Sequence, residues 1–415
     1  MSSRRRFLRL TPALAAGALA TQQTIVASPD ATQATTGELS LNGEWSFVTD
    51  PNNSGDREQW FADPGKHGAW RTVCVPHTWQ IEESLADYRG VAWYARTIEL
   101  RPEWQGLHMR IEFEAVFHSA RVWVNGQLAG EHLRKPYTAF TVELTQLVKW
   151  NQPNTLVVRV DNRFDEHMLP RGRSSDWAHD GGIYRPVQLL VTPKTYLKRL
   201  AIDAVPDFKS GKAALTIAAV LQNADVKARR GTLSLRIVEE ETGRVVLTSA
   251  RAEPVSINVG TSQTARLSAS LDGPKPWHFD HPHLYRAEVT FRATGGGEHT
   301  MESTFGIRKF ETRGVNFYLN NERVTLMGVE RMAGSNPEFG MAEPLAWIEH
   351  DHADLRNLNC IFTRVHWQQD RRVLDYCDRH GILIQTEVPT WGGDTFKNMG
   401  AHCDPDLMEN GLEQL

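Results

Sequence analysis

The 415-residue sequence predicts a multidomain protein in which two all-β domains precede the start of a parallel α/β domain. The length exceeds that of one ordinary domain, which excludes a single small binding module. Short alternating apolar and polar runs, separated by turn residues, fill residues 39–193 and 194–309 and are typical of β-sandwiches. From residue 310 to the end, strand-like runs alternate with helical ones, so the fold class changes there.

The composition excludes several classes of partner. Apolar residues make up 40% and charged residues 23%, as in globular proteins. Lys plus Arg number 46 against 50 Asp plus Glu, and the net charge of −4 provides no basic field for nucleic acid. The four cysteines, at positions 74, 360, 377 and 403, show neither a metal-ligand spacing nor a disulfide framework. We expect them to be mostly buried thiols and expect no metal.

Residues 1–20 resemble an export signal. Three arginines, Arg4 to Arg6, precede the apolar run 10–20, as in twin-arginine signals. The run is too short to anchor in a bilayer, and Ala18-Leu19-Ala20 suits signal peptidase. We expect an exported protein, periplasmic or extracellular, that makes no membrane contact after cleavage. Loss of four arginines would change its net charge from −4 to −8. The alternative is a basic N-terminal arm on a cytoplasmic protein.

The region 39–193 is predicted to be all-β. Its clearest element is the run 121–128, in which Asn125-Gly126 lies between alternating apolar residues. Asn and Gly tolerate positive φ, so this pair predicts a two-residue hairpin. The run 39–45 contains a second such pair, Asn42-Gly43, and is predicted to form another hairpin. The region is long enough for a jelly roll or a similar sandwich.

The region 194–309 is a second predicted sandwich. The runs 213–221, 231–238 and 287–292 are strand-like, and tryptophan nearly vanishes. The size fits an immunoglobulin-like domain. Nothing in it indicates chemistry, so a spacer role is expected.

The region 310–415 is predicted to begin a parallel α/β unit. Apolar residues recur at helical spacing in 344–358 and 371–380, and Gly381 is a predicted helix C-cap. Continuous apolar runs at 324–329, 360–366 and 382–388 predict buried strands between these helices.

A set of short motifs occurs in order along nearly the whole chain after residue 20. They are Leu41-Asn42-Gly43-Glu44-Trp45, Val75-Pro76-His77-Thr78-Trp79, Gly90-Val91-Ala92-Trp93-Tyr94, Val122-Trp123-Val124-Asn125-Gly126, Asp176-Trp177, Gly181-Gly182-Ile183-Tyr184-Arg185-Pro186-Val187, Thr304-Phe305-Gly306-Ile307-Arg308 and Asp378-Arg379-His380-Gly381-Ile382-Leu383. The set resembles glycoside hydrolase family 2, the family of β-galactosidases, β-glucuronidases and β-mannosidases. The resemblance implies a sugar-binding jelly roll, an immunoglobulin-like β-sandwich and a (β/α)8 TIM barrel with its active site at the strand C-termini.

The resemblance also implies a retaining mechanism with two glutamates, at the ends of barrel strands four and seven. Residues 310–415 number only 106, whereas a barrel takes about 250 residues. We therefore expect the chain to stop near strand three, without the acid/base and the nucleophile. Asn321-Glu322, the only Asn-Glu pair, is predicted to be a turn. Glu330 and Glu387, at predicted strand ends, are the alternative carboxylate pair.

The resemblance further implies sugar contacts. Asp176 matches a loop aspartate that binds a sugar hydroxyl, with turn capping as the alternative. His366 matches a sugar-contacting histidine, with a core histidine as the alternative. The other candidate ligands are Trp177, Trp367 and Trp391, which could stack on a pyranose or pack in the core, and Arg331 and Glu387. We expect Asp176 and His366 to lie in one pocket.

Two positions depart from the family pattern. Glu330-Arg331-Met332-Ala333 lacks the histidine and acid usual after strand one, and the register that fits His366 puts Thr363 where the family has arginine. Arg364 follows it, and one step on a strand is the opposite face. Arg364 is thus either a ligand or an ion-pair partner in the barrel wall.

Three functions follow as hypotheses. The first is the N-terminal portion of an exported family 2 glycosidase that hydrolyses β-galactoside- or β-glucuronide-like sugars in its full-length form. The second is a non-catalytic carbohydrate-binding protein or pseudoenzyme. The third is a structural subunit that completes its barrel with another polypeptide. The expected partner is a carbohydrate, no cofactor is implied, and a homo-oligomer is compatible with the sequence.

Overall fold

The computed structural model describes residues 37–171, 178–249, 252–390 and 404–415. From residue 37 onward these belong to one compact unit. The predicted export signal and four residues singled out above, Asp176, Trp177, Trp391 and Cys403, lie outside the described residues.

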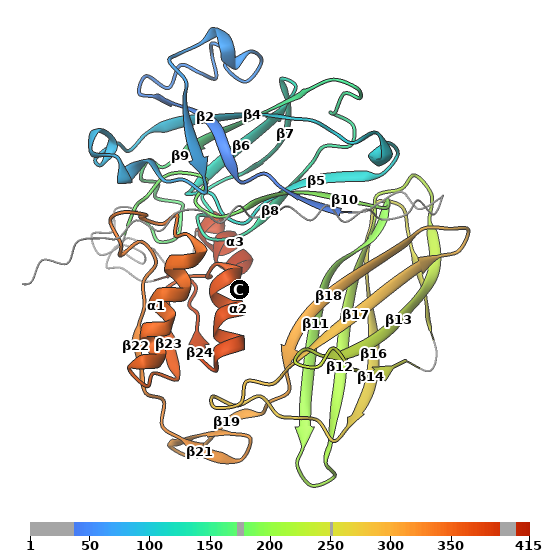
Figure 1. Ribbon diagram of the computed structural model, residues 1–415. Coiled ribbons are helices and arrows are strands. Elements are labelled where there is room, and N and C mark those ends of the chain that lie inside the picture. Colours follow the sequence, from blue (N-terminus) through green and yellow to red (C-terminus); the bar gives the residue numbers. More distant parts are fainter. Residues whose placement is uncertain (1–36, 172–177, 250–251, 391–403) are drawn as a thin grey trace, which may run out of the picture. The chain divides into compact units, whose positions relative to one another are not determined.

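The first sandwich, residues 37–192, consists of two antiparallel sheets (Figure 1). One contains, in spatial order, β1 (Gly37–Ser40), β10 (Val187–Thr192), β5 (His108–Phe113) and β8 (Phe140–Glu143). The other contains β3 (Arg71–Val75), β2 (Gly43–Asp50), β4 (Val91–Ile98), β9 (Asn154–Asp161), β6 (Ser119–Val124) and β7 (Gln127–His132). Short 3-10 helices span Pro64–Lys66, Trp79–Ile81, Glu83–Leu85 and Pro102–Trp104. Alternate residues such as Phe47, Ile111 and Val158 fill the core between the sheets.

The two Asn-Gly pairs have different outcomes. Asn125 and Gly126 have φ of 53° and 79°, and they join β6 to β7 in the predicted hairpin. The hairpin predicted at Asn42-Gly43 is wrong. β1 pairs with β10, whereas β2 pairs with β3 and β4, so this turn carries the chain from one sheet to the other.

The second sandwich, residues 195–306, also has two antiparallel sheets, which confirms the strand-like runs predicted there. One sheet is β11 (Thr195–Asp207), β12 (Lys212–Asn223) and β16 (Ser262–Asp272). The other is β14 (Val245–Thr248), β13 (Arg229–Glu239), β17 (Leu284–Ala293) and β18 (Glu298–Gly306), with β15 (Glu253–Ile257) paired to β13. Leu215, Ile237 and Val289 are among the residues of its core.

A small meander follows the second sandwich and consists of β19 (Phe310–Arg313), β20 (Asn316–Leu319) and β21 (Glu322–Val324). Asn320 and Asn321 have φ of 53° and 71° between β20 and β21, which confirms the predicted turn. A single strand over 324–329 is wrong. β21 belongs to the meander and the next strand, β22 (Gly328–Glu330), belongs to another sheet.

The α/β segment, residues 328–414, contains a parallel sheet of β22, β23 (Phe362–Arg364) and β24 (Leu383–Gln385) (Figure 1). Its helices are α1 (Leu345–Asn357), α2 (Arg371–His380) and α3 (Pro405–Gln414). The predicted helices 344–358 and 371–380 are confirmed. Asp370 caps the start of α2, and Gly381 ends it with φ of 71°. Because helices connect these parallel strands, the carboxyl ends of all three strands lie at the same edge of the sheet.

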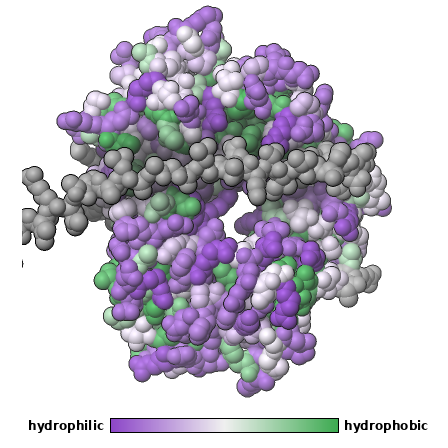
Figure 2. All heavy atoms as spheres, in the orientation of Figure 1, coloured by the Kyte–Doolittle hydropathy of each residue, from purple (hydrophilic) through white to green (hydrophobic). Residues whose placement is uncertain are grey.

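The described surface that Figure 2 shows is mostly polar, and two of the three described cysteines are buried. None of the described helices is long and apolar enough to cross a membrane. Figure 2 shows mostly hydrophilic residues on the visible face, with scattered small hydrophobic patches. Cys360 and Cys377 are buried thiols, as predicted. Cys74 is the exposed exception among the described cysteines, because its neighbours Val73 and Val75 take the inward positions of β3.

Candidate functional site

The carboxyl ends of three neighbouring strands place polar side chains together. Glu330 of β22 lies opposite Arg364 of β23, which lies opposite Gln385 of β24. Residues that are level with one another in a parallel sheet point to the same face. Active sites of barrels form at this end of the strands. We therefore take these strand ends as the candidate site.

Arg364 is bound by both candidate carboxylates. Its Nε lies 2.6 Å from Glu387 Oε1 and its Nη2 lies 3.1 Å from Glu387 Oε2, while Nη1 lies 2.9 Å from Glu330 Oε2. The two glutamates raise the pKa of Arg364, first through the hydrogen bonds of Glu387. The arrangement gives Arg364 the ion-pair role that the sequence left open.

His366 joins the same group. Its Nδ1 lies 2.6 Å from Glu330 Oε1, and the residue is only 5% exposed. Burial lowers the pKa of His366, although the Glu330 carboxylate opposes this effect. The ring is therefore neutral at pH 7 and can exchange hydrogen bonds with a hydroxyl group.

Arg331 lies elsewhere, although it is the next residue after Glu330. It is 5% exposed, and its guanidinium lies 2.9 Å from Glu343 Oε1 and 2.6 Å from Asp351 Oδ2. Burial alone would lower the pKa of Arg331, but the two carboxylates raise it. The structure thus places this predicted ligand in a buried ion-pair group, apart from His366.

Trp367 is buried as well. It is 1% exposed, and its ring stacks on that of Tyr137 from the first sandwich, with centroids 4.8 Å apart and planes 10° apart. Phe117, Met168 and Tyr184 belong to the same apolar cluster. The Trp367 ring therefore joins two parts of the protein, and its faces are not open to a pyranose. Trp391, the other tryptophan predicted near the strand ends, lies outside the described residues.

The described segment that follows residues 172–177 contacts the α/β segment at Asp180. Asp180 is 9% exposed, and its Oδ2 accepts a hydrogen bond of 3.1 Å from the Met341 backbone N–H. Burial raises the pKa of Asp180. A Cβ at Gly340 would lie 2.6 Å from the same oxygen, so the Gly340 backbone approaches the Asp180 carboxylate closely. The predicted meeting of Asp176 with His366 is untested by the described residues, and only Asp180, further along the chain, is hydrogen-bonded to the α/β segment.

Two further contacts fix the start of α2 against the first sandwich. Arg185 Nη2 donates to the Gln368 carbonyl at 2.7 Å, and the Arg371 N–H donates to Glu114 Oε1 at 2.7 Å. Burial raises the pKa of Glu114. Sequence reasoning missed these residues and Asp180, because each partner is distant in the chain. Only Arg185, inside one of the quoted motifs, carried a signal.

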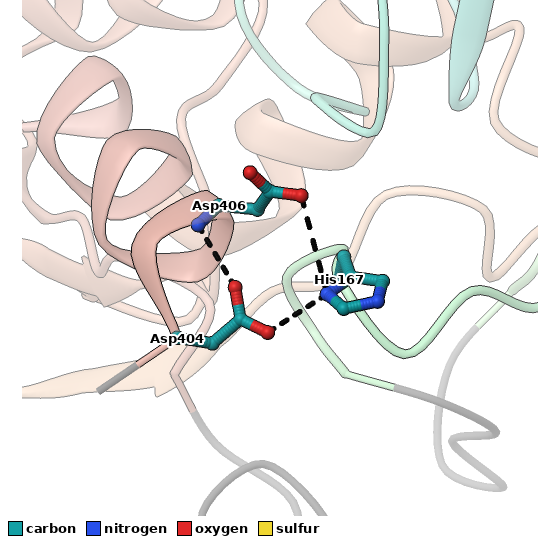
Figure 3. A group of neighbouring side chains, drawn as sticks. All are labelled: His167, Asp404 and Asp406. Carbon is teal, nitrogen blue, oxygen red and sulfur yellow. Dashed lines mark hydrogen bonds and ion pairs between the residues drawn. The ribbon is translucent and has the colours of Figure 1, made fainter. Parts of the chain in front are cut away.

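A second polar group lies where α3 meets the first sandwich (Figure 3). His167 Nδ1 is 2.8 Å from Asp404 Oδ2 and 4.0 Å from Asp406 Oδ2. The three ligand atoms lie within 4.8 Å of one another. However, Asp404 caps α3 by accepting from the Asp406 and Leu407 N–H groups, and Arg134 Nη1 binds Asp406 Oδ2 at 2.5 Å. A cation would have to displace Arg134, so helix capping and ion pairing explain the group.

Models of one protein family match almost all of the residues from 39 to 413. Residues 39–193 match the family model described as glycosyl hydrolases family 2, sugar binding domain. Residues 195–308 match the glycosyl hydrolases family 2 model, and residues 310–413 match its TIM barrel domain. The chain belongs to glycoside hydrolase family 2. This family includes a TIM barrel, and the three parallel strands lie within the part that matches it.

Individual family 2 relatives are longer than this chain. A β-glucuronidase of Bacteroides fragilis is 29% identical over 390 residues, which cover 91% of the chain and 53% of the relative. A β-galactosidase of Thermoanaerobacter pseudethanolicus is 30% identical over 377 residues, covering 87% and 48%. A crystal structure of a Bacteroides uniformis β-glucuronidase superposes with a TM-score of 0.78 and 25% identity, covering 92% and 44%. The chain spans about half the length of these relatives.

Proposed function

We propose that this chain forms the sugar-binding, N-terminal portion of a family 2 β-glycosidase that acts on β-glucuronides or β-galactosides. The observation that carries the proposal is a polar group at the ends of three parallel strands, formed by Glu330, Arg364, His366 and Glu387. The loop fixed by Asp180 is close to the same segment of the chain. The names of the similar proteins favour these two substrate classes.

The second part of the proposal is that residues 1–415 do not supply the two catalytic carboxylates. A retaining glycosidase needs one carboxylic acid and one carboxylate about 5 to 5.5 Å apart, on either side of the glycosidic bond. Glu330 and Glu387 are held by one guanidinium, that of Arg364. A sugar could not enter between them without displacing Arg364. The chain contributes substrate contacts, and hydrolysis belongs to a full-length form.

The activity test uses the 415-residue chain and aryl β-galactosides, β-glucuronides and β-mannosides. We expect no turnover above the uncatalysed rate, because loss of both members of a catalytic unit removes nearly all acceleration. The same assays are repeated with Glu330→Gln and Glu387→Gln. Turnover that either substitution abolishes would contradict this part of the proposal and would establish an unfamiliar active site.

The binding test separates a sugar site from a purely structural cluster. Titration calorimetry with D-glucuronate and with D-galactose is compared between the unchanged chain, His366→Ala and the control His350→Ala, whose side chain is 62% exposed on α1. We expect the affinity for one sugar to fall at least tenfold in His366→Ala only, as a hydrogen-bonding group is removed. Equal affinity in all three proteins would contradict a role for His366 in sugar binding.

The non-catalytic carbohydrate-binding protein remains the second candidate, favoured by the ion pairing of Glu330 and Glu387 with Arg364. It predicts the same binding but no hydrolysis in any natural form. Export through the twin-arginine route is also proposed, on the basis of residues 1–20. Fusion of these residues to a reporter, with Arg4→Lys and Arg5→Lys as the comparison, tests it directly.

A further inference from the structure

A cavity of about 960 Å³ lies at a three-way junction, apart from the strand ends described above. Its lining comes from the outer face of the sheet β1-β10-β5-β8, from β11 and β18 of the second sandwich, and from Arg371 at the start of α2. The outer face is identified by register, since the intervening residues Ile111, Leu189 and Val142 are in the sandwich core. The cavity is large enough for a small oligosaccharide.

Arg110 is the buried charge in this cavity. It is 6% exposed, and its guanidinium carbon lies 3.8 Å from the centre of the Tyr196 ring. Its Nη1 donates a hydrogen bond of 3.3 Å to the neutral hydroxyl group of Thr192. Among the described residues, no carboxylate oxygen lies within 4.0 Å of the Arg110 guanidinium, the limit for an ion pair. A buried guanidinium without a direct ion pair is costly, because the more distant charges of Glu143 and Glu112, the stacking and the hydroxyl group compensate its charge only in part.

The other charges of the cavity are unevenly paired. Two of its four carboxylates are paired with arginines: Glu112 with Arg371 and Glu302 with Arg286. Glu143 lies 3.1 Å from His108, which makes an ion pair only when that imidazole is protonated. Glu38 is the remaining acid. On the cationic side, Lys198 and Arg199 are exposed and have no ion pair among the described residues, like Arg110. Within the described ranges of the chain, three cations without a direct ion pair therefore face two carboxylates, Glu38 and Glu143, that have no lysine or arginine partner.

His299 adds a neutral donor to the cavity wall. Its Nδ1 accepts a hydrogen bond of 3.1 Å from the Leu197 N–H, so the proton of the neutral ring is on Nε2. Burial, with Arg110 nearby, lowers the pKa of His299 to about 4, and the ring stays neutral at pH 7. The lining also includes hydroxyl and amide side chains, which are suited to sugar hydroxyls: Thr141, Gln188, Thr300 and Ser303.

We propose that this cavity binds an acidic saccharide, with Arg110 as the partner of a sugar carboxylate. A planar guanidinium can receive a carboxylate through two parallel hydrogen bonds, which a small inorganic anion matches less well in a cavity of this size. Lys198 and Arg199 attract the anion at the entrance. The site is distinct from the strand ends, and its binding does not require hydrolysis.

The test is titration calorimetry of the 415-residue chain with trigalacturonate in 20 mM salt. The methyl ester of the same trisaccharide and sodium sulfate serve as comparison ligands. We expect trigalacturonate to bind, the ester to bind at least tenfold more weakly, and sulfate to compete only weakly. Arg110→Gln should reduce the affinity for trigalacturonate at least tenfold, because it removes a charged hydrogen-bond donor.

A second variant covers the risk that Arg110→Gln does not fold. The double variant Lys198→Gln/Arg199→Gln changes two exposed side chains, and we expect a three- to tenfold loss that fades as the salt concentration rises. The matched control is Lys209→Gln/Arg266→Gln, which removes the same charge from exposed positions outside the cavity. Equal affinity for acid and ester, competition by sulfate as strong as self-competition, or equal loss in both double variants would each overturn the proposal.

Discussion

Trp367 of the α/β segment stacks face to face on Tyr137 of the first sandwich, with 4.8 Å between ring centroids. The two residues are 230 positions apart and both are nearly inaccessible to solvent. Buried aromatic pairs contribute more than their apolar area alone. The stack therefore couples the stability of the α/β segment to that of the first sandwich.

This coupling predicts that Trp367→Ala lowers the free energy of unfolding by about 3 to 5 kcal/mol, the usual cost of removing a buried aromatic. Phe317→Ala, at a position that is 39% exposed, is the control and should cost less than about 1 kcal/mol. Urea unfolding followed by tryptophan fluorescence and by circular dichroism measures both. A Trp367→Ala protein as stable as the control would show that the stack is dispensable.

The ion pair of Arg331 with Glu343 predicts a non-additive response. Both side chains are 5% exposed and lie 2.9 Å apart, so Glu343→Gln leaves the buried Arg331 charge with Asp351 alone and should cost about 2 kcal/mol, as for a lost hydrogen bond to a charged group. The double variant Arg331→Met/Glu343→Leu should cost less than the sum of its two single variants. Asp272→Asn breaks the exposed pair with Lys212 and should change stability by less than about 0.5 kcal/mol. If the cost of the double variant equalled the sum of the costs of Arg331→Met and Glu343→Leu, the prediction would be refuted.

Glu413 of α3 predicts a pH dependence. Burial would raise its pKa, but His132, Lys135 and Thr138 outweigh it and lower the pKa from 4.5 to about 2. The folded state thus holds its proton less tightly than the unfolded state. The stabilisation, about 2 kcal/mol after allowance for solvent screening of this partly exposed carboxylate, is present above pH 4.5 and is lost as the pH falls towards 2.

The measurement compares thermal unfolding midpoints of the unchanged chain and Glu413→Gln between pH 7 and pH 2.5. The difference should be largest at pH 7 and should shrink below pH 4.5. Glu349→Gln, on the exposed side of α1, should show no such trend. A difference that stays constant across the range would mean that the Glu413 carboxylate is not held in its charged form.

Gly381 provides a test of local geometry. Its φ is 71°, and a Cβ there would lie 2.2 Å from the Phe279 carbonyl oxygen. Gly381→Ala should therefore lower the free energy of unfolding by more than about 2 kcal/mol, through backbone strain and a clash with backbone. Gly243→Ala is a matched control, since its φ is 68° but nothing lies within 4 Å of the added atom. Equal costs in thermal unfolding would show that the clash relaxes freely.

Local signals allowed part of this fold to be predicted. The helical spacing of α1 and α2, the glycine after α2 and the Asn125-Gly126 turn act within a few residues, and each appears as expected. The sequence indicates a turn at Asn42-Gly43, but turn residues do not show whether the two flanking strands pair with each other or belong to different sheets. The run 324–329 failed for the same reason, since an apolar run does not show where one sheet ends.

The candidate site was predictable to a smaller extent. His366 and Glu330 meet because Glu330 ends one strand and His366 follows the neighbouring parallel strand, and strand order implies this neighbourhood. Arg331 points the other way, as the alternation of a strand requires, although the resemblance had suggested a ligand. Asp180 and Tyr137 could not be found, because their partners Met341 and Trp367 come from a segment that is 161 to 230 residues further along the chain.

The hydrogen bond from Met341 to Asp180 has a consequence for how such a protein diversifies. Two segments from different parts of the gene pack together here, in an apolar cluster that also contains Met332 and Trp367, which follow two of the strand ends. An insertion or deletion in either loop would remove the support of the other, so a change of specificity is expected to require paired changes. Among related genes, we expect the lengths of the segments near 178–181 and 334–341 to vary together rather than independently.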